Sequence, residues 1–177
     1  MISRRTLVLC AACAAVLPAG ALQAAPDPKG DPFAYLVELS NVVLDEIRKN
    51  PALHKADPEQ VRKLVDETLM PAADFEMMTR MTVGPRWRQA SAEERTELME
   101  AFKALLVRVY SGALTTVEDH RCELRPTRNK KVRDEMIVRT LLKSAGRNDI
   151  GLDYRIYRDK TGTWRIVDVN VEGIWMV

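Results

Sequence analysis

Residues 150–171 read IGLDYRIYRDKTGTWRIVDVNV, and this stretch decides the fold class of the 177-residue chain. In its first half, the apolar side chains of Leu152, Tyr154 and Ile156 alternate with charged or polar ones. A two-residue period is typical of a strand that buries one face. The second half has its own apolar set on one face, which consists of Val167, Val169 and Val171. The stretch therefore predicts two antiparallel strands.

Runs with the same period precede this stretch, so we expect a sheet of four strands. They cover residues 122–127, 136–143, 152–158 and 164–171, and Gly146 and Gly162 mark turns of a meander. An antiparallel sheet with one apolar face needs a covering layer, because that face would otherwise meet water. We expect the segments in front of the sheet to supply this layer.

Four helix start signals lie before residue 119, at Asp31-Pro32, Asp57-Pro58, Pro71 and the Ser91-Glu94 capping box. The last signal opens the longest helix, which is predicted over residues 91–118. Its wide apolar face comprises Leu98, Phe102, Leu105, Leu106, Val109, Ala113, Leu114 and Val117. The predicted fold class is α+β: a twisted antiparallel sheet of four strands in the C-terminal half, wrapped by N-terminal helices.

The first 25 residues have the pattern of an export signal. A basic start, MISRR, is followed by an apolar run and by small residues. We expect a cleaved signal over residues 1–25 and a single domain over 26–177. The apolar run is shorter than the ~20 residues of a membrane span, which makes an uncleaved anchor the weaker reading. Arg4 and Arg5 fit an ordinary secretion signal or a twin-arginine signal.

Composition excludes several classes of protein. With 46% hydrophobic and 29% charged residues, the chain is neither a multi-span membrane protein nor disordered throughout. Residues 26–177 contain 25 basic and 25 acidic side chains, a balance that argues against a nucleic-acid-binding protein. The acidic excess lies before residue 121 and the basic excess after it. There are two interpretations of this separation of charge. It orients the docking of a partner or contact with lipid headgroups, or it is incidental.

Residues that could support catalysis are few, so we do not expect an enzyme, a metal or a cofactor. His54 and His120 are predicted to face solvent, and Cys122 to be buried. Asp168 is expected to form a structural hydrogen bond, with a catalytic acid as the alternative. The basic run over 125–133 is a solvated turn, a headgroup or docking contact, or, least favoured, a nucleic-acid contact.

Methionines are unusually frequent in the third helical segment, which contains Met77, Met78 and Met81. Methionine suits irregular or adaptable apolar contacts, although core filling is its more common role. Because this segment is expected to lie opposite the apolar face of the sheet, we predict that the fold encloses an apolar cavity large enough for a lipid.

Several short motifs, taken in order, resemble one family over about residues 31–177. They are Asp31-Pro32-Phe33, Leu69-Met70-Pro71, the stretch from Thr82 to Arg95, Ala101-Phe102-Lys103, the stretch from Val109 to Leu114, and the stretch from Trp164 to Ile174. The family is MlaC, also called the toluene-tolerance family, the phospholipid-binding component of the Mla lipid-transport system.

The resemblance implies a periplasmic shuttle that is not an enzyme. Such a protein carries a glycerophospholipid between an outer-membrane lipoprotein and porin complex and an inner-membrane ABC transporter complex, and so maintains outer-membrane lipid asymmetry. Acyl chains lie inside the fold and the headgroup faces water. We expect a monomer whose only ligand is the lipid, and transient contacts with both complexes.

The resemblance also implies a set of lipid-binding residues. Positions that match the family are Tyr110, Tyr154 and Ile174. Apolar patterning adds Met78, Met81, Phe102, Leu106, Leu114, Ile156, Val169 and Val171. Family members continue past Glu172-Gly173 with an aromatic-containing segment and a terminal helix, so either the sequence is truncated or the cavity lacks part of its wall.

Two other functions stay open at the level of sequence. One is a small-molecule enzyme on a cone-shaped α+β fold, with Asp168 as its titratable group. The other is a periplasmic adaptor with a solid core that binds a partner and no ligand.

Overall fold

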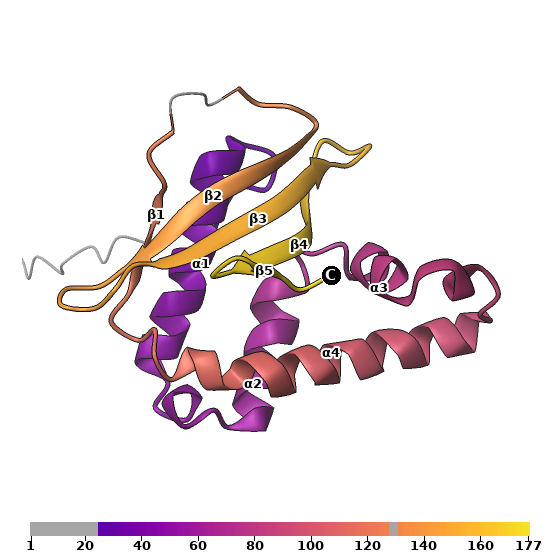
Figure 1. Cartoon of the computed structure of the whole chain (residues 1–177), viewed down its shortest axis with the longest axis horizontal. Helices are drawn as coiled ribbons and strands as arrows, with labels where there is room; N and C mark the ends of the chain where they lie inside the picture. Colours follow the sequence, from indigo (N-terminus) through magenta and orange to yellow (C-terminus); the bar gives the residue numbers. More distant parts are fainter. Residues whose placement is uncertain (1–24, 128–130) are drawn as a thin grey trace, which may run out of the picture.

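The structure is a computed structural model that describes residues 25–127 and 131–177. Within these ranges the helices come first and the strands second, as the sequence predicts (Figure 1). Nearly all of the expected signal segment, residues 1–25, lies outside the described residues. No helix in the described part of the chain combines the length and the apolar character that crossing a membrane requires.

The sheet is an antiparallel meander in which each strand pairs with the next along the chain. Its strands are β1 (Arg121–Leu124), β2 (Glu135–Lys143), β3 (Ile150–Arg158), β4 (Trp164–Val171) and β5 (Ile174–Trp175). The α+β class and four of the strands are thus confirmed. Two details differ. The first strand ends at Leu124 instead of 127, and the two-residue β5 was not predicted.

Four α-helices and three short helical turns precede the sheet in the described residues. The helices are α1 (Pro32–Lys49), α2 (Pro58–Leu64), α3 (Phe75–Val83) and α4 (Ala92–Leu114), and the turns are η1 (Leu53–Lys55), η2 (Val65–Leu69) and η3 (Gly84–Arg88). The Asp31 side chain accepts from the Ala34 N–H, and Ser91 and Glu94 form the predicted capping box. The side-chain caps therefore define these helix starts as expected.

The third helix starts later than predicted. Residues after Pro71 form a turn, and Ala73 makes a parallel bridge to Ile166 of β4. The helix begins only at Phe75, because the Asp74 carboxylate accepts the Met77 N–H at 3.0 Å and so caps this end.

The longest helix ends at Leu114, four residues before the predicted end. The hydroxyls of Thr115 and Thr116 donate to the carbonyls of Gly112 and Ala113, at 2.8 Å each. These bonds satisfy acceptors that the last helical turn leaves open, and they let the chain turn toward β1.

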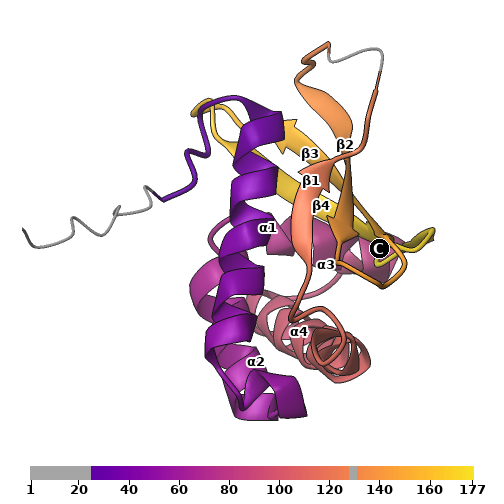
Figure 2. The same ribbon diagram turned by 90° about the vertical axis from the view of Figure 1, so that its left-hand side faces the viewer.

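Two apolar clusters hold the helices to the sheet. In the first, the N-terminal half of α1 packs on β2, β3 and β4, and its buried members include Leu36, Val138, Tyr154, Ile156 and Trp164. In the second, the C-terminal half of α1 meets η1, α2, Val117 and the β1–β2 edge. Figure 2 shows α1 running beside the sheet, with α2 and α4 gathered below it.

A polar contact joins α1 to β3 inside the first cluster. The Ser40 hydroxyl donates to the Leu36 carbonyl at 2.6 Å, so the Tyr154 hydroxyl is the donor in its 2.8 Å bond to Ser40 Oγ. Both side chains are buried, and burial raises the pKa of Tyr154 well above its usual range. The tyrosine therefore stays neutral and keeps its donor.

A double-mutant cycle on this pair tests the coupling. We expect Ser40→Ala to lower the free energy of unfolding by about 1–3 kcal/mol, because it leaves the buried Tyr154 hydroxyl without an acceptor. Tyr154→Phe costs about 1 kcal/mol, and the double variant costs less than the two single changes together. Urea unfolding of all four proteins measures these values. Additive losses would show that the hydroxyls do not interact.

Candidate functional site

Helix α4 leaves part of its apolar face uncovered. Of its 23 residues, all of which are described, only Phe102 is buried. Leu105 is 43% exposed and Val109 is 58% exposed, one helical turn apart on the same side. Leu106 and Tyr110 are half-buried beside them. Because large apolar side chains rarely gather on the surface without a function, this face is the first candidate for a binding site.

The N-terminal half of α4 is anchored to α3 and to the α2–η2 segment. The rings of Phe75 and Phe102 stack with centroids 5.5 Å apart. On another side of the helix, Lys103 lies 3.2 Å from Asp66, and Glu100 lies 2.9 Å from the Arg62 guanidinium. The polar side of α4 is therefore held by ion pairs, while the side that carries Leu105 and Val109 is left free of them.

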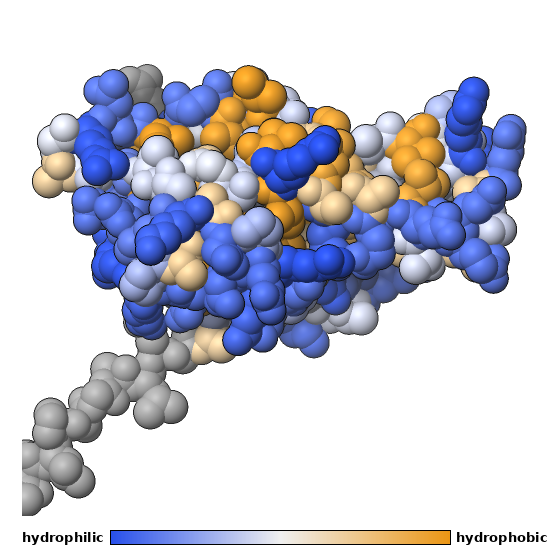
Figure 3. Space-filling model, turned by 90° about the horizontal axis from the view of Figure 1, so that it is seen from below, coloured by the Kyte–Doolittle hydropathy of each residue, from blue (hydrophilic) through white to orange (hydrophobic). Residues whose placement is uncertain are grey.

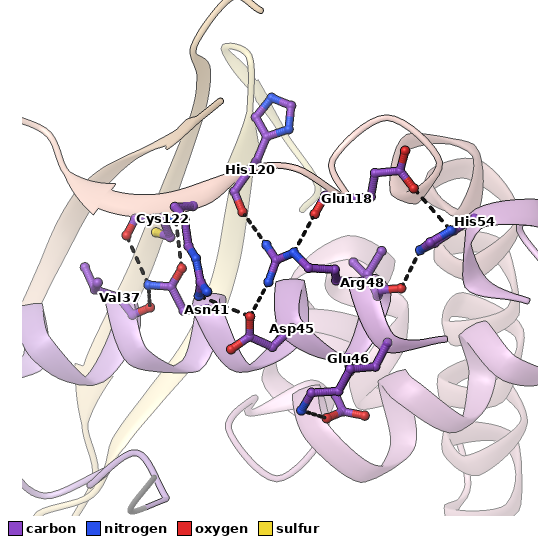
Figure 4. A network of polar contacts seen from close by, with 12 residues as sticks. Val37, Asn41, Asp45, Glu46, Arg48, His54, Glu118, His120 and Cys122 are labelled. Atoms are coloured by element: carbon purple, nitrogen blue, oxygen red, sulfur yellow. Dashed lines mark hydrogen bonds and ion pairs between the residues drawn. The ribbon is translucent and has the colours of Figure 1, made fainter. Parts of the chain in front are cut away.

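The turn after α4 is fixed by α1 and η1 (Figure 4). The Arg48 guanidinium donates to the carbonyls of Glu118 and His120, at 3.1 Å each, and also to Asp45. The His54 ring contacts the Glu118 carboxylate at 3.1 Å and the Ile47 carbonyl at 2.7 Å. Arg48 lies on α1 and His54 lies on η1, and both elements pack into the core. Their contacts therefore fix the path of the chain where α4 ends.

Helix α3 is positioned by Asp74, which caps its start and also accepts the Tyr157 hydroxyl at 2.6 Å. This hydrogen bond, together with burial, raises the pKa of Tyr157 to about 12. Helix α3 is thereby tied to β3. Of the two methionines predicted as lipid contacts, Met78 points into the core at 5% exposure and Met81 is 41% exposed.

The C-terminal end of the sheet contributes a further exposed apolar side chain, Ile174, at 68%. Beside it, the Arg155 guanidinium lies 4.9 Å from the centre of the Trp175 ring. Asp168 is buried and accepts the N–H groups of Val169 and Val177 at 2.9 and 3.1 Å. Burial raises the pKa of Asp168, and its oxygens serve the structural hydrogen bonds that the sequence analysis expected.

The eleven predicted lipid-binding residues differ in how far they are buried. Tyr154, Ile156 and Val169 belong to the first core cluster or pack on it, and Leu114 packs on the second. Met78 and Phe102 are buried, whereas Leu106, Tyr110 and Val171 are half-buried. Met81 and Ile174 are exposed. The structure therefore brings some of them together in a core and leaves others on the surface.

Leu105 and Val109 were not among the predicted binding residues, although they are exposed apolar residues of the same helix face. The sequence did contain a signal, since both were recognised as members of the apolar face of the long helix. Helical periodicity shows that a face is apolar, but it does not show whether the protein core or a ligand covers that face.

Enclosure of the predicted cavity stays a prediction. Two pockets in the described part of the structure have volumes of about 320 and 290 Å³, and none of the eleven predicted residues lines either of them. Apolar surface is instead open to solvent. Figure 3, which views the molecule from the side of α4, shows orange apolar residues grouped among blue hydrophilic ones.

The structure corrects one of the two histidine predictions. His54 is half-buried, but His120 is 1% exposed instead of facing solvent. Its position directly before β1 places it beneath the turn from α4, and its ring nitrogens have no hydrogen-bond partner among the described residues. Cys122, two residues later, is buried as predicted, and burial raises the pKa of its thiol. In the described ranges no cluster of His, Cys, Asp or Glu could hold a metal ion.

Comparison with known proteins gives three consistent similarities. A family model described as MlaC protein matches residues 37–177. The intermembrane phospholipid transport system binding protein MlaC of Haemophilus influenzae is 23% identical over 150 residues, which cover 82% of this chain and 69% of that protein. A phospholipid-binding protein of Ralstonia solanacearum, solved in complex with a phospholipid, is 31% identical with a TM-score of 0.75, covering 83% of this chain and 81% of that one. This chain belongs to the MlaC family.

Proposed function

We propose that this protein binds a glycerophospholipid through the uncovered apolar face of α4 and carries it across the periplasm. The observation that carries the proposal is the state of α4, a 23-residue helix with an apolar face and a single buried residue. The phospholipid in the Ralstonia solanacearum structure supports the same class of ligand.

The energy of lipid transfer explains why a carrier needs such a surface. A phospholipid has ~30 methylene groups in its two acyl chains, so transfer from a bilayer into water costs on the order of 24 kcal/mol at ~0.8 kcal/mol per methylene. A soluble protein offsets this cost only by offering apolar contacts of comparable extent. Leu105 and Val109 can make such contacts, because they are 43% and 58% exposed.

We assign the lipid contacts to the apolar face of α4 and to the neighbouring exposed side chains of α3 and β5. On α4 the contacts are Leu105, Leu106, Val109 and Tyr110, and the neighbours are Met81 and Ile174. The remaining predicted residues, which are Met78, Phe102, Leu114, Tyr154, Ile156, Val169 and Val171, are buried or half-buried in the protein and are not assigned to this surface. The headgroup faces water, so the site needs no cofactor or metal.

The place of the protein in transport follows from its family. The name of the Haemophilus influenzae relative supports a role as the binding component of an intermembrane phospholipid transport system. We propose that the protein acts without catalysis, as a monomer, between an outer-membrane lipoprotein and porin complex and an inner-membrane ABC transporter complex, and that it thereby maintains lipid asymmetry. The hydrogen bonds of Asp168 favour this role over an enzyme, because both go to backbone groups of the fold.

Charged substitutions on α4 test the site. We expect Val109→Glu and Leu105→Glu to lower the amount of co-purified phospholipid about tenfold or more, because a carboxylate would have to be buried against an acyl chain. Both positions are exposed in the protein, so the substitutions leave the core intact. Organic extraction and mass spectrometry of protein purified from the periplasm give the lipid content per protein.

Ala104→Glu is the matched control, since Ala104 is exposed on the polar side of the same helix. This variant should retain its lipid. Equal lipid content in all three variants and the parent protein would place the lipid elsewhere. Absence of lipid from the parent protein would favour the adaptor with a solid core.

Removal of the lipid should destabilise the protein, because ligand binding stabilises the folded state by mass action. At a free lipid concentration about 100 times the Kd the gain is about 2.7 kcal/mol. For a domain of this size this raises the melting temperature by about 5–10 °C. Thermal unfolding of delipidated and reloaded samples measures the difference. Identical melting temperatures would show that the folded state has no preference for the lipid.

A further inference from the structure

A basic pocket lies beside the β1–β2 connection, away from the apolar face of α4. Its volume is about 320 Å³. The side chains that line it are Phe33, Leu124, Arg125, Thr127, Lys131, Arg133, Glu135, Met136, Ile137 and Arg139. Figures 1 and 2 both show the start of β2 at the end of the sheet opposite α4. The pocket is therefore separate from the proposed lipid site.

The charge of the pocket is strongly positive. Four of its lining side chains are cationic, and the only lining carboxylate among the described residues is Glu135. The part of the chain that contains the pocket has the same sign, because residues 121–177 contain 13 Lys and Arg against eight Asp and Glu. Such an excess raises the local concentration of anions around this end of the molecule.

Three arginines of the pocket have hydrogen-bond donors to spare. Arg125 and Arg139 each lie 3.8 Å from the carboxylate of Asp153, a distance that allows electrostatic attraction but no hydrogen bond. Within residues 25–127 and 131–177, neither these two guanidinium groups nor that of Arg133 donates a hydrogen bond. An anion placed in the pocket would satisfy donors that the fold leaves unused.

Apolar side chains lie beside these cations. Phe33 is buried, and Leu124 and Met136 are partly buried where they pack against the first core cluster. These side chains give the pocket an apolar wall beside its exposed cations.

We propose that this pocket binds a phosphate group, held by Arg125, Arg133 and Arg139. Three guanidinium forks offer more donors than the two oxygens of a carboxylate can accept, whereas phosphate presents three or four oxygens. The pocket has room for one such group and not for two acyl chains. The phosphate belongs either to a lipid headgroup at a membrane surface or to a small soluble phosphate, and these two sources share the same chemistry.

Two binding assays test the pocket and separate the two sources. Calorimetric titration with inorganic phosphate measures the soluble source. Sedimentation with vesicles of phosphatidylglycerol and phosphatidylcholine, compared with vesicles of phosphatidylcholine alone, measures the headgroup source. We expect the protein to bind in at least one assay. Binding to phosphate in solution assigns the soluble source, and binding only to the phosphatidylglycerol vesicles assigns the headgroup.

Arg133→Gln and Arg139→Gln remove exposed cations of the pocket, so the fold is retained, which an unchanged melting temperature verifies. Each change should weaken binding about fivefold, and the pair about 25-fold, at ~1 kcal/mol per basic residue. Lys160→Gln, in the β3–β4 turn outside the pocket, is the control for net charge and should bind as the parent protein does.

The proposal is overturned if the parent protein binds in neither assay, if the paired variant binds as well as the parent, or if Lys160→Gln weakens binding as much as a pocket substitution. The co-purified phospholipid content of the paired variant should equal that of the parent. Because that content reports on the α4 face, failure of the phosphate site and failure of the lipid site give different results.

Discussion

The attachment of α4 at its middle and at the turn that follows it is the constraint on which the candidate site depends. An apolar helix face normally turns toward the core, because burial of apolar surface contributes about 25 cal/mol per Å². In this protein the Phe75–Phe102 stack holds the middle of the helix, and Arg48 holds the turn that follows its C-terminal end. Because α1 is fixed in both core clusters, helix α4 is directed away from the sheet. Leu105 and Val109 on α4 therefore stay exposed.

The two core clusters allow this arrangement because α4 contributes few apolar side chains to them. The first is built from α1 and the sheet, and the second takes from α4 and the turn after it mainly Val107, Leu114 and Val117. Under the proposed function, stability and ligand contact fall to different parts of the chain. A carrier would gain from this division, because a helix that contributes little to the folded core can take up and release a ligand without unfolding the rest.

Much of the fold could be predicted from local chemistry. Asp31 and Ser91 cap helices at the positions that the sequence predicts. The alternation of Leu152, Tyr154 and Ile156 with polar residues likewise marks a strand. Boundaries set by tertiary contacts could not be predicted. The start of α3 depends on the bridge between Ala73 and β4, a contact between residues far apart in sequence. The burial of His120 likewise depends on how the turn after α4 enters the sheet.

The candidate site was less predictable than the fold, because a core face and a ligand face have the same sequence pattern. Tyr154 and Val109 illustrate this. Tyr154 is predicted to contact lipid, and in this structure its hydroxyl is bonded to Ser40 inside the first core cluster. Val109 lies on an equally apolar face and is 58% exposed. Only the three-dimensional arrangement separates the two cases, since it determines which apolar residues have protein partners and which are left for a ligand.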